Sequence, residues 1–137
     1  MDLYHGSSAE ICDQIISSEE GFDLRMSKAG NWGNAIYFAE LSSCSNSYSK
    51  PAKDSGLRTM ILAKVVIGDA YQCQGDKSLR RPPEKKVTLK QGIMSLMQNP
   101  PSIPVLYDSV KGMLGDSPVF MVYCSRKAYP EYLITYM

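Results

Sequence analysis

Short apolar runs separated by polar segments indicate a sheet-rich fold with few helices. The strongest is the near-continuous run RTMILAKVVIG at 58–68, which predicts a strand buried on both faces in the middle of a sheet. Four shorter runs predict further strands, at DLYH (2–5), AIYF (35–38), VFMVYC (119–124) and YLITYM (132–137). Between these runs, DKSLRRPPEKK (76–86) predicts a loop, because proline cannot donate a ladder hydrogen bond.

The first helix is predicted directly after the first strand. Ser7 or Ser8 can cap a helix over residues 9–18. Its apolar stripe would be formed by Ile11, Ile15 and Ile16. Gly21 follows, a residue that tolerates the left-handed conformation with which helices often end.

Two other segments predict short helices. Residues 40–49 favour a helix only weakly, because serine and asparagine compete for backbone hydrogen bonds. Residues 88–98 predict another, closed by two prolines. Its methionines, Met94 and Met97, are interpreted as core residues. Because strands and short helices follow no regular βαβ rhythm, the predicted class is α+β.

Composition limits the possible functions. The chain has 137 residues, 44% of them hydrophobic and 21% charged, which suits one domain over 1–137 with its own core. A formal charge of +1 excludes a global field for capturing nucleic acid. No apolar run approaches the roughly 20 residues needed to cross a bilayer, and the polar N-terminus is unlike a signal peptide. We therefore expect no membrane association and a cytoplasmic or nuclear location.

The four cysteines predict no metal centre. None has CxxC spacing, and the single histidine cannot complete a zinc site with them. Free thiols in a reducing compartment are the simplest interpretation. The alternative is a secreted domain with two disulfides.

Four motifs occur in order along the chain. They are LYHGS (3–7), GNAIYFAE (33–40), SNSY (45–48) and AYPEYLITY (128–136). In this order they resemble the catalytic domain of the poly(ADP-ribose) polymerase family. Three further runs, MILAKVVIG (60–68), RRPPEK (80–85) and LYDSV (106–110), resemble its mono-ADP-ribosyltransferase branch. The resemblance implies an ADP-ribosyltransferase fold, with two packed, mainly antiparallel β-sheets and a few short flanking helices. It covers nearly the whole chain, which would be a minimal form lacking the usual segment before the first strand.

The resemblance also implies a reaction. NAD would be the donor substrate, nicotinamide would leave, and a protein acceptor or the chain itself would receive ADP-ribose, without a metal. A planar amide-bearing ring favours aromatic walls and a hydrogen-bond clamp on its carboxamide. The residues that would bind NAD by family resemblance are His5, Gly6, Ser7, Gly21, Tyr37, Ala39, Ser45 and Tyr48.

Their individual roles follow from the same resemblance. Tyr48 would stack on nicotinamide, with Tyr37 as the opposite wall. The Ser45 hydroxyl and the Gly6 backbone would hold the carboxamide, since glycine lets a ligand approach the main chain closely. His5 would bind a ribose hydroxyl and Ser7 the adenosine side.

The catalytic triad of the family would read His5, Tyr37 and Val119 in this chain. Polymerising members carry glutamate at the third position, where it orients the acceptor hydroxyl and stabilises the cationic transition state. Such a contact is typically worth about 3 kcal/mol. Because valine cannot provide it, we expect transfer of one ADP-ribose and no chain elongation. Glu131, in the last motif, is interpreted as structural.

Two other functions stay open. Val119, together with Ala35 in place of a family glycine, is compatible with an inactive domain that only binds NAD or ADP-ribose or acts as a scaffold. A basic segment suggests ADP-ribosylation of nucleic-acid ends, although Asp76 and Glu84 favour a solvated loop instead. Its basic residues are Arg80, Arg81, Lys85, Lys86 and Lys90. Target choice is expected in the loop 77–104.

Overall fold

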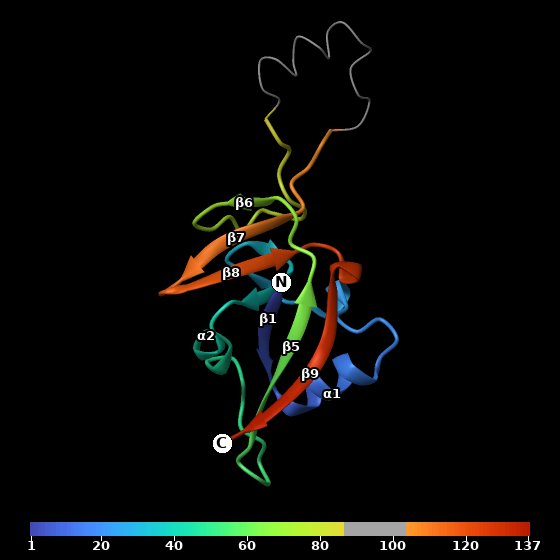
Figure 1. Cartoon of the computed structure of the whole chain (residues 1–137), viewed down its shortest axis with the longest axis vertical. Coiled ribbons are helices and arrows are strands. Elements are labelled where there is room, and N and C mark those ends of the chain that lie inside the picture. Colours follow the sequence, from blue (N-terminus) through green and yellow to red (C-terminus); the bar gives the residue numbers. More distant parts are fainter. Residues whose placement is uncertain (87–103) are drawn as a thin grey trace, which may run out of the picture.

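The structure is a computed structural model that describes residues 1–86 and 104–137. Its described part is built on a seven-stranded sheet in the order β6-β7-β8-β4-β1-β5-β9, with a separate two-stranded sheet, β2-β3 (Figure 1). All neighbours in the large sheet are antiparallel except β6 and β7. Within residues 1–86 and 104–137, two short α-helices and two 3-10 turns accompany the sheets, which confirms the predicted α+β class.

The large sheet has two halves that meet at one weak joint. In one half, β4 (Ile36–Ala39) pairs with β8 (Ser117–Val122) at four positions, and in the other, β1 (Asp2–Ser7) pairs with β5 (Arg58–Val65) at six. Between the halves, β1 and β4 share only the pair Tyr4–Ala39. Figure 1 shows β7 and β8 running across the long axis that β1, β5 and β9 follow. The two sheets implied by the resemblance are therefore hydrogen-bonded to each other at this seam.

All five predicted strands are present. They are β1, β4, β5, β8 and β9 (Ala128–Tyr136). The sequence patterns did not predict β7 (Ser109–Leu114), β6 (Ala70–Gln72), β2 (Ala29–Gly30) or β3 (Gly33–Asn34). The first of these, SVKGML, is interrupted by a lysine and a glycine, and the other three are too short to show a period.

The strand at 58–68 is a correction to the prediction. It becomes β5, which lies next to the edge strand β9 and exposes Lys64. The strands buried on both faces are instead β4 and β8. One of their faces joins a core with Leu3 and Ile61, through Ile36, Phe38, Phe120 and Val122. The other face packs around Trp32, through Ala39, Val119 and Met121.

The helices begin and end close to the predicted residues. Helix α1 (Ala9–Ser17) is capped by the Ser8 hydroxyl, which accepts from the Ile11 N–H at 3.4 Å. Its predicted stripe is wrong in part, because Ile11 and Ile16 are 46% and 45% exposed and the buried residue is Cys12. Gly21 has the expected positive φ of 63°.

Helix α2 (Ser42–Asn46) is a single short helix within the predicted span and packs against both β1 and β4, so it covers the seam. The 3-10 turns are η1 (Leu24–Met26) and η2 (Ser125–Lys127). The helix predicted at 88–98, with Met94 and Met97, lies outside the described residues, as does Lys90.

The four cysteines are free, as predicted. Of the helices in residues 1–86 and 104–137, none is both long and apolar enough to cross a membrane. Within the same ranges, no three His, Cys, Asp or Glu side chains lie close enough together to hold a metal ion.

Candidate functional site

The seam between β1 and β4 is bridged by a histidine side chain. Past Tyr4–Ala39 the two strands are no longer paired, and the Nδ1 atom of His5 lies 2.8 Å from the Tyr37 carbonyl oxygen. Its ring packs edge-on against Phe22, with ring centroids 5.2 Å apart, and tilted against Phe38. The seam is thus held together by a side chain where main-chain pairing stops.

This contact fixes the tautomer of neutral His5. A carbonyl oxygen only accepts, so Nδ1 carries the proton and donates to Tyr37. The Nε2 atom then has a free lone pair, which can accept a hydrogen bond from a hydroxyl group. Burial lowers the pKa of His5 below its ordinary 6.5, against a smaller raising effect of the bond to Tyr37. The ring is therefore neutral at pH 7.

The lowered pKa of His5 predicts a loss of stability in mild acid. The unfolded chain takes up this proton near pH 6.5 and the folded chain only at lower pH. The free energy of unfolding should therefore fall as pH drops below about 6.5, until the folded pKa is reached. Urea unfolding at several pH values should show this for the wild type, relative to a His5→Asn variant. A difference that is constant from pH 7.5 to pH 5 would contradict it.

Tyr37 uses its hydroxyl to hold the hairpin of β2 and β3. The hydroxyl donates to the Gly33 carbonyl at 2.7 Å and accepts from the Trp32 N–H at 3.0 Å. Tyr123 donates to the Trp32 carbonyl at 2.6 Å, so two tyrosines fix the same turn. Burial raises the pKa of Tyr37, which keeps its hydroxyl protonated. Because its only O–H proton is donated to Gly33, this hydroxyl has no donor left for a ligand, and Tyr37 offers chiefly its ring.

Trp32 and Tyr123 were not predicted as part of the site. Trp32 is 1% exposed, its indole N–H donates to the Cys73 carbonyl at 3.1 Å, and its ring lies over Gly112. The only tryptophan of the chain, in an otherwise polar loop, was the signal in the sequence. The residues that Trp32 contacts, Cys73, Gly112 and Tyr123, are distant in sequence, so no local sequence pattern predicts them.

Gly6 and Ser45 are neighbours, as the resemblance implied. A Cβ atom at Gly6 would lie 1.9 Å from the Ser45 carbonyl oxygen. The glycine is therefore required by the approach of α2 to β1, a reason that the sequence alone did not supply. Ser45 is buried, and its carbonyl also accepts from the Ser49 hydroxyl at 3.4 Å.

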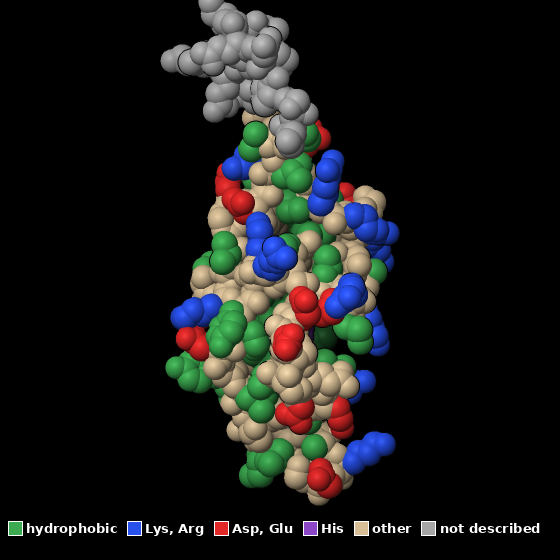
Figure 2. Space-filling model, turned by 90° about the vertical axis from the view of Figure 1, so that its right-hand side faces the viewer, with side chains coloured by type: hydrophobic (Ala, Val, Ile, Leu, Met, Phe, Trp, Pro, Cys, Tyr) green, Lys and Arg blue, Asp and Glu red, His purple; other side chains and the backbone are tan. Residues whose placement is uncertain are grey.

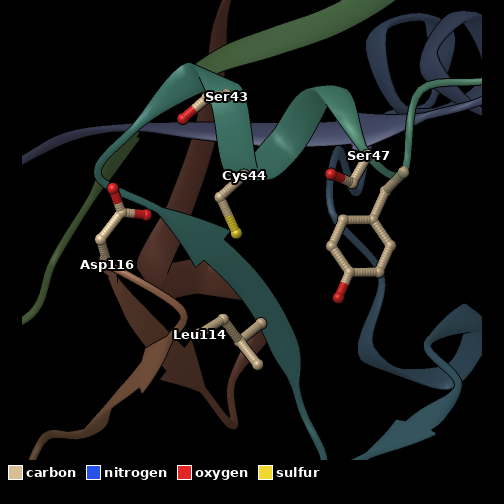
Figure 3. Close-up of a pocket in the computed structure, with 6 residues that line it drawn as sticks. Ser43, Cys44, Ser47, Leu114 and Asp116 are labelled. Atoms are coloured by element: carbon tan, nitrogen blue, oxygen red, sulfur yellow. The ribbon is translucent and has the colours of Figure 1, made fainter.

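Tyr48 stands just beyond α2 and is 58% exposed. It lines a hollow of about 360 Å³, together with Ser43, Cys44, Ser47, Leu114 and Asp116. Figure 3 shows Ser47 on one side of this hollow and Asp116 on the other, with Cys44 and Leu114 between them. Of the residues predicted to bind NAD, Tyr48 alone lines it, and its exposed ring is available for stacking.

Val119 of β8 pairs with Ala39 of β4. Ala39 is two residues from Tyr37 along β4, so their side chains lie on the same face of the sheet. It is 3% exposed and packs into the core around Trp32. Ala35 is 1% exposed in that core. The third triad position thus carries a buried apolar side chain beside Tyr37.

The remaining predicted residues lie around this centre. Ser7 ends β1, paired with Thr59, and Gly21 packs against Pro130 of β9. Gly21 precedes Phe22, whose ring contacts His5. Glu131 lies 3.3 Å from the Lys64 ammonium, as suits a structural role.

Comparison with known proteins agrees with these motifs. The sequence profile of the poly(ADP-ribose) polymerase catalytic domain matches residues 1–137. A probable poly [ADP-ribose] polymerase of Dictyostelium discoideum is 33% identical over 98% of this chain and 33% of its own length. Protein mono-ADP-ribosyltransferase PARP12 of Mus musculus is 32% identical over 98% of the chain and 16% of its own length. For protein mono-ADP-ribosyltransferase PARP11 of Mus musculus the identity is 27%, over 98% and 41%.

The chain thus spans less than half the length of each of these relatives. The family match over residues 1–137 includes every described helix and strand. Two of the four sequence motifs, LYHGS and GNAIYFAE, lie at β1 and β4, the strands that meet at the seam. The chain belongs to the poly(ADP-ribose) polymerase catalytic domain family.

Proposed function

We propose that this chain is a mono-ADP-ribosyltransferase, which moves one ADP-ribose from NAD to an acceptor and releases nicotinamide. The observation that carries the proposal is the seam, where His5 bridges β1 and β4 while α2 covers both strands. The names of the PARP11 and PARP12 relatives support the same activity. In the reaction, the bond between nicotinamide and ribose breaks and its electron pair leaves with the neutral ring. A nucleophile of the acceptor then bonds to the ribose carbon.

The described residues fit parts of NAD. The neutral His5 ring offers Nε2 as an acceptor for a ribose hydroxyl, since its Nδ1 is used by Tyr37. Tyr48 offers an exposed aromatic face for the nicotinamide, and Tyr37 a ring whose hydroxyl is already bonded. Gly6 of β1 lies against the Ser45 carbonyl of α2, and their contacts to the carboxamide are proposed from the family motifs. Binding would orient the donor, which is a large part of the rate gain in group transfer.

The buried Val119 supports a single addition. It offers no carboxylate to activate the hydroxyl of a first ADP-ribose, so the acceptor would have to bring its own nucleophile. A protein side chain or the chain itself is the proposed acceptor, in the cytoplasm or the nucleus.

A binding-only domain is the second candidate, favoured by the same Val119 and by Ala35. Modification of nucleic-acid ends is supported less. Of the basic residues suggested for it, Lys85 lies 2.8 Å from Asp69 and Arg81 lies 3.9 Å from Glu84. Acidic and basic side chains are interspersed on the face shown in Figure 2. These pairings are typical of a solvated surface.

The test uses NAD labelled in its adenylate part, with and without added RNA. Free nicotinamide, label on protein and the length of the attached chain are measured together. We expect nicotinamide release with single ADP-ribose units on protein and no need for RNA. Polymer would overturn the reasoning from Val119. Neither label nor nicotinamide, with NAD still raising the melting temperature, would establish a binding domain instead.

A further inference from the structure

We propose that the carboxylate of Asp116 selects acceptors that carry a positive charge beside the modified residue. The inference rests on the proposed function and adds to it the chemistry of the acceptor. Asp116 lies in the turn between β7 and β8, and of the residues that the structure describes it alone brings a charge to the lining of the hollow beside Tyr48. The same hollow is therefore lined by Tyr48, whose ring is proposed to stack on nicotinamide, and by the negatively charged Asp116.

The turn that carries Asp116 is held in place against α2. The Ser117 hydroxyl accepts from the Leu41 N–H at 3.3 Å, and the Pro118 carbonyl accepts from the Glu40 N–H at 3.0 Å. Gly115, with a φ of 59°, allows the sharp reversal just before the carboxylate. Two hydrogen bonds therefore tie the turn to the segment that leads from β4 into α2, and the position of Asp116 relative to α2 is fixed.

The charge of Asp116 is available to a ligand. Its side chain is exposed, and none of the ion pairs in the described part of the chain includes it. Glu40, also exposed, begins the segment bonded to the same turn and adds a second acidic residue there. The pyrophosphate of NAD is anionic and would be repelled here. A cationic group of the acceptor would be attracted.

Because valine at position 119 is uncharged, the Asp116 carboxylate has more influence on which acceptor binds. In the third triad position Val119 contributes no charge, although it lies only three residues after Asp116, near the start of β8. An acceptor that reaches the ribose from this side therefore meets the charge of Asp116 at the rim of the hollow, and no charge from the third triad position. Such a charge can choose among acceptors without taking part in bond breaking, which makes Asp116 a specificity residue.

The experiment compares two synthetic peptides, each containing one glutamate, one serine and one cysteine as possible acceptors. In one peptide Nε-trimethyllysine flanks each acceptor, and in the other glutamine does. Trimethyllysine keeps the positive charge and cannot itself receive ADP-ribose. With wild-type protein and labelled NAD, we expect kcat/KM for the cationic peptide to be about fivefold higher at low salt. The ratio should fall toward one as salt screens the pair.

Variants assign the effect to Asp116. For Asp116→Asn the ratio of the two peptides should fall to about one, and for Asp116→Lys it should fall below one. Asp13→Asn removes the same charge from the exposed surface of α1, which packs on β5 and β9 and lies away from α2 in Figure 1, and should keep the wild-type ratio. Melting temperatures of all four proteins show that each is folded.

The outcomes separate this inference from the proposed function. Transfer by wild type with no preference, or to neither peptide while nicotinamide is released, would overturn the inference alone. So would an equal fall for both peptides in Asp116→Asn, which would place the charge's effect on NAD. If the wild type releases no nicotinamide and labels nothing, the proposed function is wrong and the inference fails with it.

Discussion

His5→Ala is expected to lower ADP-ribose transfer at least about a hundredfold while leaving the protein folded. The substitution removes the Nε2 acceptor proposed for the ribose hydroxyl and the Nδ1 bond to Tyr37 that bridges β1 and β4. A misplacement of about 1 Å between reacting groups can by itself cost about 10²-fold in rate. Transfer would be followed as label on protein from labelled NAD, and folding by the melting temperature.

His5→Asn separates the two roles of this side chain. The asparagine amide can donate to the Tyr37 carbonyl in place of Nδ1, but it has no atom in the position of Nε2. We expect this variant to melt closer to the wild type than His5→Ala does, yet to stay deficient in transfer. Recovery of transfer in His5→Asn would show that the histidine acts only by holding the seam together.

Gly6→Ala is expected to abolish transfer and to destabilise the fold. The added Cβ would lie 1.9 Å from the Ser45 carbonyl oxygen, a backbone atom, so α2 itself would have to move away from β1. Overpacking of this kind typically costs about 1–3 kcal/mol. The shift would also displace Ser45 and Tyr48, which α2 and its C-terminal turn carry. Urea unfolding measures the first effect and labelling from NAD the second.

Gly56→Ala is the matched control. Its Cβ would meet no atom within 4 Å, but the residue has a φ of 71°, which costs an L-residue about 1–2 kcal/mol. It should therefore lose similar stability and keep transfer. If Gly56→Ala also abolishes transfer, lowered stability alone explains the loss in Gly6→Ala.

The sequence predicted those parts of the fold in which neighbouring residues determine the structure. The five apolar runs became strands, and of the two serines predicted as possible caps, Ser8 caps α1. The position of each strand in the sheet, and whether both of its faces are buried, was not predictable from neighbouring residues. The run at 58–68 is the longest but contains Lys64, whereas the runs at 35–38 and 119–124 are apolar at every position and become β4 and β8, the strands enclosed on both faces. The length of an apolar run therefore did not identify the enclosed strands.

The candidate site was likewise predicted in part from the sequence. The ordered motifs indicated His5, Gly6, Tyr37 and Ser45, and the structure brings these four to the seam under α2. Their roles toward NAD stay predictions. The motifs did not reveal why residue 6 must be glycine or that Tyr123 holds Trp32, because both depend on contacts between distant segments. Asp116 likewise has no signal of its own in the sequence, since its proximity to the hollow arises only when the β7–β8 turn docks on the α2 segment.

The order of the strands also determines how this domain must reach its native state. Except in the β7–β8 hairpin, neighbours in the sheet are remote in the chain: Ala39 pairs with Val119, and Arg58 with Tyr136. Both halves therefore require closure of long loops before their contacts become favourable. Topologies dominated by such non-local pairs fold on a scale of about milliseconds to seconds, whereas helical bundles take microseconds to milliseconds. Until β8 and β9 pair with them, β4 and β5 each have an unpaired edge beside apolar side chains. Folding intermediates with this incomplete sheet are therefore the most exposed to aggregation.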